Sequence, residues 1–535
     1  MGDIWDNGKM MLLLTFGTIT AMICTSLLTS RISSNWAYSL RRALTDKVAT
    51  FSNAEMNKFT TPSLITRTTN DVVQVQNFAS MGLHLLIKAP ITAVWAILKI
   101  SNSSLDWTLA VFSFVLAILI VVITLVVIAL PKFKKIQKLT DDLNDVTREN
   151  VSGVRVVRAF NAEQYQNKKF EKVNNEITKT NLFTSRTMGI LSPFMMFSMN
   201  TLTIVIYIIG ARLINEAALV DKSTVLGNMS AYTQLAMHVV MSFMLLIMIF
   251  IILPRTSVAA NRISQVLNTN PAIKDGDGID EINNPGSIEF KNVSFSYSDD
   301  LDHLALSNLN FKVKPGETVA IIGSTGSGKT TLVNLITRFY DVTSGEILVN
   351  GNNVKDYPIE ELNKQISLAT QKAVLFSGDV KKNIIYGSDY DEERFNKVKS
   401  ISQANFIDEL DGKENAFVAQ GGTNFSGGQK QRLSIARCLY KEADIYIFDD
   451  SFSALDYRTD MLVRKGINDQ YNDKTIIIVA QRIGTIRQAD QIIVMDEGRI
   501  VGIGKHEDLL NSCEVYKDIA LSQLSQEELE LKEAN

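Results

Sequence analysis

The chain has 535 residues, more than one domain usually contains, and it carries a formal net charge of −3. Together with an isoelectric point of about 6.0, this charge argues against nucleic acid as the main partner. The three cysteines, Cys24, Cys438 and Cys513, have neither metal-ligand spacing nor the density of a disulfide framework, so we interpret them as structural.

Five stretches in the first half of the chain are long and apolar enough to cross a bilayer, which takes ~20 residues. They are Met10–Ser30, Met81–Ser101, Trp107–Leu130, Met188–Ile214 and Met229–Leu253. The second is the weakest, because it carries His84, Lys88, Pro90 and Lys99. A signal peptide is a poor alternative for the first stretch, since two Asp precede Lys9 and no A-x-A cleavage site follows.

Basic residues in the loops predict how these spans are oriented. Arg31–Gln76 and Lys132–Arg186 are rich in Lys and Arg, so the positive-inside rule places both in the cytosol. The segments 102–106 and 215–227 are then expected outside. Five spans followed by a cytosolic C-terminal half would leave residue 1 outside as well.

Two features of the spans have a functional and a structural interpretation. Lys88 could act on a substrate or a proton, but it lies a third of the way along its span, where a lysine can reach the interface, and we favour that explanation. The Met and Phe side chains of Phe194–Met199 could line an adaptable apolar cavity or pack between helices, and both interpretations stay open.

A linker and a second domain are predicted after the spans. Residues 268–286 are rich in Asn, Asp, Gly and Pro and lack helical or strand periodicity. Ser287–Phe290 and Val293–Tyr297 have the pattern of strands in one sheet, and Val319–Ile322 that of a buried strand. The segment that follows, Gly323–Thr331, satisfies G-x-x-x-x-G-K-[ST] in the strand-to-helix context of a P-loop.

The P-loop pattern assigns nucleotide-binding roles to consecutive residues. Its glycines expose N–H groups to the phosphates, Lys329 reaches the β- and γ-phosphate oxygens, and the Thr330 hydroxyl ligates Mg²⁺. The predicted ATP-binding residues of this loop are Gly323, Ser324, Thr325, Gly326, Ser327, Gly328, Lys329, Thr330 and Thr331.

Further phosphate-binding features follow one another later in the chain. Phe425–Gln429 is a glycine-containing turn that opens a predicted helix, Lys430–Leu439. Paired glycines let the backbone approach an anion, and the helix N-terminus directs free N–H groups at it. Ile445–Phe448 has the length and composition of a buried strand and ends in Asp449 and Asp450, where a carboxylate could hold the Mg²⁺ of a nucleotide.

These features, with the turn Ser453–Asp456 after them, resemble the signature motif, Walker B strand and D-loop of ATP-binding cassette (ABC) proteins. Ser39–Leu44 and Leu64–Asp71 resemble the first intracellular loop of ABC exporters, and Glu149–Phe160 resembles the second. By periodicity alone these are long amphipathic helices, and the resemblance implies that they end in short coupling helices that contact ATPase domains. The resemblance covers essentially the whole chain.

The exporters of this family have six spans in each half, so the resemblance also implies that a first span is missing here. Ile4–Gly8 looks like the family's external segment before its second span. A late assigned start or a shortened chain would explain this, and a genuine five-span protein is the alternative.

The resemblance implies roles for residues outside the P-loop. Tyr297 would stack on adenine, with core packing as the alternative. Gln371, in a segment that resembles the Q-loop, would contact Mg²⁺ or the attacking water, and Asp449 and Thr330 would be the other Mg²⁺ ligands. Asp456 belongs to the D-loop. The residues that would contact a partner's ATP are Ser426, Gly427, Gly428 and Gln429.

Two positions depart from the family's pattern. Asp450 stands where the family usually has the Glu that orients the hydrolytic water, and Gln481 stands where it has His. A carboxylate one methylene shorter retreats by more than ~1 Å, and misplacement on this scale can cost ~10²-fold in rate. Gln can donate a hydrogen bond to phosphate but cannot carry an imidazolium charge. Both changes beside an intact P-loop indicate a site that binds ATP and hydrolyses it slowly.

The sequence therefore predicts an all-α transmembrane domain of exporter type, 1–267, then the linker, an α/β P-loop ATP-binding cassette domain, 287–523, and an acidic tail, 524–535. We expect a multi-pass cell-membrane protein with its ATPase domain in the cytosol, using ATP and Mg²⁺ to export an amphipathic or lipophilic substrate. A second, different half-transporter is the expected partner. A homodimeric exporter, or an ABC protein acting as a regulator or channel, is the alternative.

Overall fold

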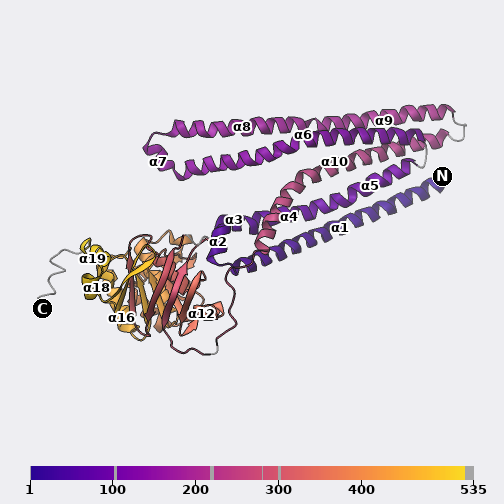
Figure 1. The fold of residues 1–535 in the computed structure, drawn as a ribbon. Helices are drawn as coiled ribbons and strands as arrows, with labels where there is room; N and C mark the ends of the chain where they lie inside the picture. The colour runs from indigo at the N-terminus through magenta and orange to yellow at the C-terminus, as the bar shows by residue number, and fades with distance from the viewer. Residues whose placement is uncertain (1, 102–104, 217–221, 280, 299–302, 524–535) are drawn as a thin grey trace. The chain divides into compact units, whose positions relative to one another are not determined.

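The computed structural model describes residues 2–101, 105–216, 222–279, 281–298 and 303–523. These residues form two compact units (Figure 1). The first consists of Met1–Ala49 and Pro62–Thr269, and the second of Thr50–Thr61 and Asn270–Asn535. A short segment from the first half of the chain therefore belongs to the unit that is formed mainly by the second half. The segment 102–104 of one predicted external turn, residues 217–221 of the other and the predicted tail 524–535 lie outside the described residues.

The described part of the first unit is helical throughout. Its α-helices are α1 (Gly2–Ala49), α3 (Thr61–Thr66), α4 (Val72–Asn77), α5 (Leu83–Ser101), α6 (Leu105–Ser152), α7 (Val154–Ala159), α8 (Glu163–Gly189), α9 (Leu191–Glu216) and α10 (Lys222–Leu267), with π-helical turns at Arg67–Asp71 and Phe78–Gly82. Among the described residues, five helical segments are long and apolar enough to cross a membrane, judged by length and composition. They are Ile4–Ala49, Thr61–Ile100, Leu105–Ser152, Glu163–Asn215 and Lys222–Leu246.

Small residues and a few polar contacts hold these helices together. Ala89, Ala93 and Ala96 are buried along one face of α5, which packs against α10. Across the same interface the Thr92 and Ser242 hydroxyls are 2.7 Å apart.

The side chains of the Phe194–Met199 segment differ in their burial. Met195 is buried in the bundle, and Phe194 and Met199 pack beside it, whereas Met196 and Phe197 are exposed. Helix packing therefore explains one side of this segment and leaves the other side free. Lys88 is exposed on α5.

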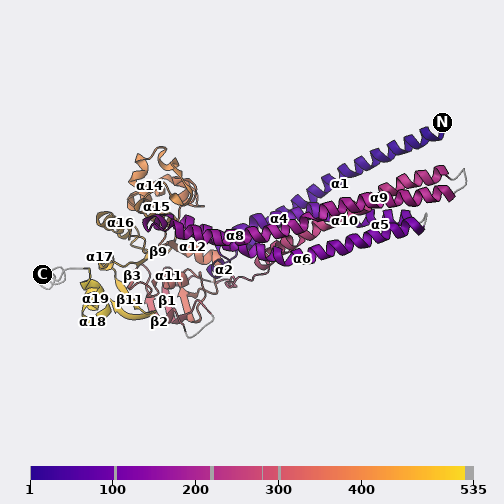
Figure 2. The same cartoon turned by 90° about the horizontal axis from the view of Figure 1, so that it is seen from above.

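The helices that form the predicted cytosolic loops continue directly from the spans. α6 runs unbroken through 48 residues, and α8 lies beside it (Figure 2). Short helices are found where the resemblance implies coupling helices, α7 between α6 and α8 and α2 (Asn53–Phe59) after α1.

The second unit is built on a six-stranded sheet in the order β12-β11-β3-β10-β9-β6, in which only the β11–β12 pair is antiparallel. An antiparallel sheet in the order β2-β1-β4-β5 and a small β7-β8 pair complete it. The strands are β1 (Ile288–Phe295), β2 (Leu306–Val313), β3 (Thr318–Gly323), β4 (Ser344–Val349), β5 (Asn352–Asn353), β6 (Ile366–Ala369), β7 (Gly378–Asp379), β8 (Phe417–Val418), β9 (Ile445–Asp449), β10 (Thr475–Val479), β11 (Gln491–Asp496) and β12 (Arg499–Gly504).

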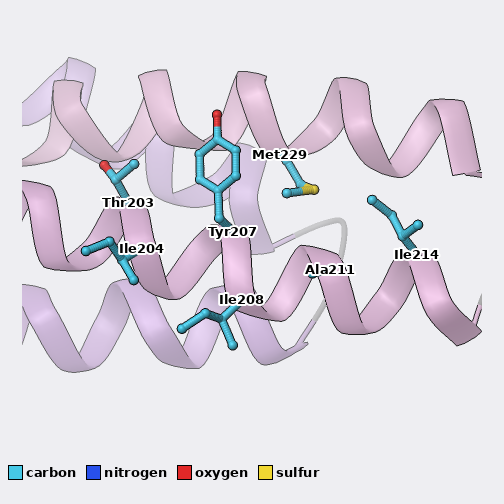
Figure 3. Close-up of a pocket in the computed structure, with 7 residues that line it drawn as sticks. All are labelled: Thr203, Ile204, Tyr207, Ile208, Ala211, Ile214 and Met229. Carbon is cyan, nitrogen blue, oxygen red and sulfur yellow. The ribbon is translucent and has the colours of Figure 1, made fainter.

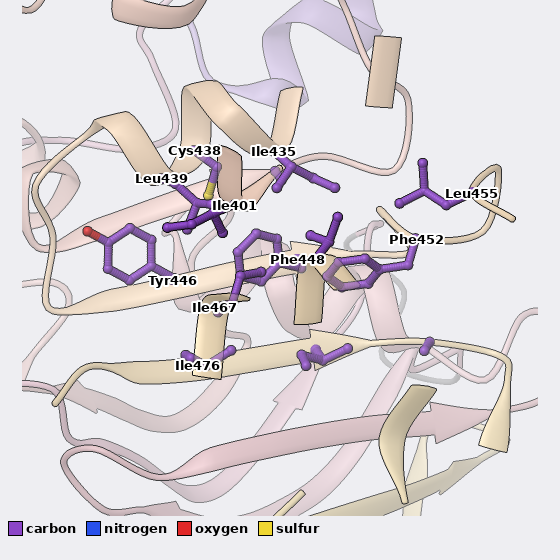
Figure 4. Close-up of a cluster of buried hydrophobic side chains, with 14 of the residues drawn as sticks. Ile401, Ile435, Cys438, Leu439, Tyr446, Phe448, Phe452, Leu455, Ile467 and Ile476 are labelled. Atoms are coloured by element: carbon purple, nitrogen blue, oxygen red, sulfur yellow. The ribbon is translucent and has the colours of Figure 1, made fainter. Parts of the chain in front are cut away.

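Apolar side chains on both faces of the six-stranded sheet explain the continuous hydrophobic runs in the sequence. Ile476 and Ile478 of β10 pack into one core and Ile477 and Val479 into the other. Figure 4 shows part of the first core, where Phe448 of β9 lies near Cys438. The helices of this unit are α2, α11 (Lys329–Ile336), α12 (Ile359–Gln365), α13 (Val380–Ile385), α14 (Glu392–Ile401), α15 (Gly427–Tyr440), α16 (Tyr457–Gln470), α17 (Ile483–Ile486), α18 (His506–Ser512) and α19 (Glu514–Leu521), with 3₁₀ turns at Asn405–Glu409, Lys413–Asn415 and Gln420–Gly422.

Candidate nucleotide-binding site

Four parallel strands bring the predicted site residues to one edge of the sheet. The P-loop follows β3, Asp449 ends β9 and Asp450 comes next, while Gln371 and Gln481 lie two residues after β6 and β10. Because the carboxyl ends of parallel strands meet at the same edge, residues far apart in the sequence become neighbours there.

The P-loop backbone requires glycine at specific positions. Gly326 and Gly328 have φ angles of 86° and 97°, in the region that side chains rarely adopt. At Gly323 a Cβ would lie 2.1 Å from the carbonyl oxygen of Met495, which leaves no space for a side chain. α11 begins at Lys329, so its N-terminal N–H groups close the loop.

Lys329 lies inside this loop. Its Nζ donates to the carbonyl oxygens of Gly323 at 2.8 Å and Ser324 at 2.6 Å, and to Ser327 Oγ at 3.3 Å. Burial lowers the pKa of Lys329, and the nearby carboxylates of Asp450 and Asp449 oppose this effect. The ammonium group is thus placed at the centre of the anion-binding loop, held by neutral acceptors that phosphate oxygens could replace.

The residues predicted to hold Mg²⁺ lie together at the strand ends. Thr330 Oγ1 is 3.5 Å from Asp449 Oδ1, and Asp449 is 4% exposed. Burial raises the pKa of Asp449 to about 6. Among the described residues, no group of three or more His, Cys, Asp or Glu side chains could hold a metal ion. The Thr330 hydroxyl and the Asp449 carboxylate are nevertheless hard oxygen donors, which would suit Mg²⁺ completed by phosphate and water, and Gln371 has a third such donor in its amide oxygen.

Asp450 accepts hydrogen bonds from the two glutamines predicted to act with it. Its Oδ2 lies 3.2 Å from Gln371 Nε2 and 3.4 Å from Gln481 Nε2. Its backbone has a φ of 47° and its N–H donates to Val479 O, so the residue sits in a tight turn directly after β9. One oxygen of the carboxylate is therefore bound by two amides, which restrict how the group is oriented.

Tyr297 is 56% exposed beside the P-loop, and its hydroxyl lies 2.9 Å from Thr331 Oγ1. The exposed ring could stack on a base, as the resemblance implies. It also packs edge-to-face on Tyr340, with ring centroids 5.2 Å apart.

Tyr340 connects this site to α2, and the sequence analysis did not identify the residues that make this contact. The Tyr340 hydroxyl accepts a hydrogen bond of 3.1 Å from Asn57 Nδ2. The buried Glu55 carboxylate accepts hydrogen bonds from the backbone N–H groups of Ser52 at 2.8 Å and Ala272 at 3.0 Å. The Ser52–Glu55 contact is a local capping box, but no local pattern could have revealed the other two contacts, which join residues 217 and 283 positions apart.

The predicted signature turn forms a complete helix cap. Ser426 Oγ accepts from the Gln429 N–H at 3.3 Å, and Gln429 Oε1 accepts from the Ser426 N–H at 2.9 Å, a capping box at the start of α15. A Cβ at Gly427 would meet no atom of the described chain within 4 Å. Packing within this chain therefore does not require glycine there.

Asp456 has a structural role within the chain. Its carboxylate accepts from the N–H of Thr459 at 3.0 Å and from the Thr459 hydroxyl at 2.7 Å, which caps α16. This cap accounts for the aspartate whether or not a partner contacts the same turn.

The first unit carries an open apolar groove of about 440 Å³, formed mainly by one face of α9 (Figure 3). Its lining residues are Thr203, Ile204, Tyr207, Ile208, Ala211, Ile214 and Met229. Gly210 lies so close to Met229 of α10 that a Cβ would be 2.4 Å from its side chain, so the two helices are in tight contact beside the groove. No charged residue lines this groove.

Comparisons with known proteins identify both units. The sequence profile of the ABC transporter transmembrane region matches residues 5–243, and that of the ABC transporter ATP-binding region matches residues 306–453. An ABC transporter ATP-binding protein of Mycobacterium tuberculosis is 38% identical over 526 residues, covering 96% of this chain and 88% of that relative. The chain belongs to the ABC transporter family.

Other relatives agree with this assignment. The ABC transporter ATP-binding protein YfiB of Bacillus subtilis is 32% identical over 98% of this chain and 90% of its own length. The ATP-dependent lipid A-core flippase of Syntrophus aciditrophicus is 32% identical over 92% of this chain and 81% of its own length. A solved bacterial Atm1-family ABC exporter with ATP bound matches with a TM-score of 0.77 at 24% identity, over 93% of this chain and 87% of that one.

This ABC transporter is accordingly a multi-pass membrane protein whose ATP-binding unit is cytoplasmic, and it has the exporter fold. Its second unit is an ATPase coupled to transport. The predicted fold class, an exporter-type helical domain followed by an α/β ATP-binding cassette, is confirmed.

Proposed function

We propose that this chain is one half of a heterodimeric ABC exporter, in which its own ATP site hydrolyses slowly and its signature motif serves the site of a different partner. The geometry around Asp450 carries this proposal. A hydrolytic site needs a positioned water and a contact to the γ-phosphate. Here the carboxylate is short and binds two amides, from Gln371 and Gln481, at 3.2 and 3.4 Å.

The same site keeps what ATP binding requires. The P-loop glycines, Lys329 and the exposed ring of Tyr297 would hold the triphosphate and the adenine. Mg²⁺ held by Thr330, Gln371 and Asp449 would neutralise charge on the phosphates. The lysine would exchange its carbonyl contacts for phosphate oxygens, and Gln481 would donate a neutral hydrogen bond to the γ-phosphate.

The signature turn supports the role toward a partner. Ser426–Gln429 is preorganised by its capping box, and the open space at Gly427 leaves room for an anion to approach the helix N-terminus. A glycine that its own chain does not require is explained if another chain's nucleotide lies against it.

For the substrate we propose an amphipathic or lipophilic molecule. The uncharged groove on α9 fits an apolar chain, and it is formed by a segment that spans the membrane. Relatives named as ATP-dependent lipid A-core flippases are consistent with this class. Drug, lipid and peptide exporters share these motifs, so the class is proposed from the groove and not from the ATPase unit.

The proposal is tested in the complex of this chain with its co-purified partner half. Lys329→Ala should weaken ATP binding at this chain's own site and leave measurable turnover. Gly427→Asp, which puts a side chain and a negative charge at the signature turn, should nearly abolish turnover. Gly427→Ala is the matched control, because its Cβ meets nothing in the described chain, and it should lose far less.

Equal losses of ATP turnover from Lys329→Ala and Gly427→Asp would contradict the proposed difference between the two ATP sites. Turnover of the chain alone at the rate of the pair would favour a homodimer. If ATP turnover persists but inside-out vesicles accumulate no lipophilic substrate, a regulator or channel is favoured over an exporter.

A further inference from the structure

A basic surface lies where α6 leaves its apolar stretch, and the nucleotide site does not explain it. Trp107–Leu130 is about 36 Å long at 1.5 Å per residue, enough to cross a ~30 Å hydrocarbon core. Lys132, Lys134, Lys135 and Lys138 follow within two turns, and no acidic residue occurs before Asp141. The chain as a whole has a net charge of −3, so this local excess of positive charge is not a consequence of composition.

The neighbouring helix carries a further cation near the same end of the span. α6 and α8 pack side by side, and Lys132 Nζ lies 5.4 Å from the ring centroid of Phe183 on α8 (Figures 1 and 2). Because the two helices are antiparallel, Arg186 lies about 4.5 Å further toward the membrane than Phe183. It is exposed, and α8 has no acidic residue from Lys179 to Arg186.

These cations are available for an external ligand. Lys134, Lys135, Lys138 and Arg186 are exposed, and within the described residues none of them forms an ion pair or a hydrogen bond through its side chain. In a helix, Lys138 is a surface neighbour of both Lys134 and Lys135, and Lys132 reaches toward Phe183 of α8. Phe133, between two of the lysines, is an apolar ring that is 37% exposed.

We propose that this basic collar, defined as Lys134, Lys135, Lys138 and Arg186, binds the phosphate headgroups of anionic phospholipids in the cytoplasmic leaflet. Clustered Lys and Arg directly on the cytosolic side of a span attract anionic lipid, and the attraction falls off within a Debye length. We favour a lipid surface over an acidic protein as the ligand, because the lysines directly follow the span and are expected at the depth of the lipid headgroups. This lipid-binding proposal does not depend on the proposed difference between the two ATP sites.

The test measures lipid association directly. The full-length chain, with its partner half where one co-purifies, is reconstituted into phosphatidylcholine vesicles that contain spin-labelled phosphatidylglycerol or spin-labelled phosphatidylcholine. We expect the motionally restricted fraction to show a preference for phosphatidylglycerol of about threefold in low salt, which declines as NaCl is raised.

The triple variant Lys134→Gln, Lys135→Gln, Lys138→Gln should reduce this preference to near unity. The matched control removes two exposed lysines of α8 that lie about 8 and 14 Å further from the membrane than Lys138, Lys172→Gln and Lys168→Gln, and should keep the preference. Lys134→Arg, Lys135→Arg, Lys138→Arg should keep it too, which separates loss of charge from misfolding.

Absence of a phosphatidylglycerol preference in the unsubstituted protein would overturn the proposal, and so would a preference that survives the triple Gln variant. If the unsubstituted protein shows no preference but an acidic protein partner is released by the triple variant, the surface is a protein interface instead.

Discussion

At the scale of single residues, the proposed slow hydrolysis rests on Asp450 and Gln481. The amides of Gln371 and Gln481 lie 3.2 and 3.4 Å from Asp450 Oδ2 and orient the carboxylate. A glutamate would extend the carboxylate by one methylene, and histidine in place of Gln481 would remove one of the two amides and supply a ring that can carry charge.

We therefore predict that Asp450→Glu combined with Gln481→His raises ATP turnover of this chain at its own site by about tenfold or more. The measurement is steady-state phosphate release in a complex whose partner site is disabled. Gln481→Asn is the control, since it keeps a neutral amide and should give no gain. A double variant as slow as the parent would mean that these two positions do not limit hydrolysis.

Asp449 gives the site a pH dependence. Burial raises its pKa to about 6, so its ionised form is disfavoured in the folded protein, and the carboxyl takes up a proton as the pH falls through 6. Mg²⁺ requires the ionised form, so proton and metal compete. Below pH 6 the apparent Mg²⁺ affinity in the presence of ATP should fall, approaching about tenfold per pH unit.

Calorimetric titration of Mg²⁺ into the ATP-loaded protein between pH 5 and 8 would measure this effect. Asp449→Asn should bind Mg²⁺ weakly at every pH and show a much smaller dependence. An unsubstituted protein whose Mg²⁺ affinity is flat across this range would refute the assignment of Asp449 as the titrating ligand.

At the scale of elements, α2 is part of the ATPase unit although it lies before most of the helices of the first unit in the chain. Glu55 binds the N–H of Ala272 and completes a capping box with Ser52. Desolvation tends to raise the pKa of Glu55, but the hydrogen bonds from Ser52 and Ala272 outweigh it and lower the pKa. The helix is thus held by a charged group, and hydrogen bonds to charged groups contribute about 1.5–3 kcal/mol each.

We predict that Glu55→Ala loosens α2 from the second unit and increases amide hydrogen exchange across 50–61. Asn53→Ala, an exposed substitution in the same helix, is the control and should leave exchange in this segment nearly unchanged. Equal protection in Glu55→Ala and the parent protein would show that the carboxylate is not what holds the helix.

The elements also show which features a sequence can reveal. β3, β9 and α15 follow from local patterns, because a buried strand, an acidic strand end and a capped helix each have a signal within a few residues. The α2 attachment has no such signal, since Asn57 and Tyr340 are 283 positions apart and meet only through the fold. The sequence also could not show which side chains of Phe194–Met199 are buried. A helix that is apolar on all sides does not indicate which side its neighbours cover.

At the scale of the whole molecule, the arrangement of the nucleotide site implies a second chain. The P-loop and the signature turn are both intact, but a nucleotide held by this P-loop lacks the usual hydrolytic pair. Two copies of this chain would contain two impaired sites. Pairing with a different half that has Glu and His at the positions matching Asp450 and Gln481 would give one impaired and one competent site.

A cysteine cross-linking experiment separates these assemblies. Ser324→Cys in the P-loop and Ser426→Cys in the signature turn would come together only between two copies of this chain that pair head to tail. Cys24 is exposed and is replaced by Ala, whereas Cys438 and Cys513 are buried. Burial raises the pKa of Cys438 to about 12, so Cys438 remains unreactive.

In membranes that contain both halves, we predict little ATP-dependent disulfide dimer of this chain. Placing cysteine at the matching P-loop serine of the partner half should produce a strong cross-link with Ser426→Cys. A dominant homodimer band formed with ATP would contradict the heterodimer, because it would show the two impaired sites assembling with each other.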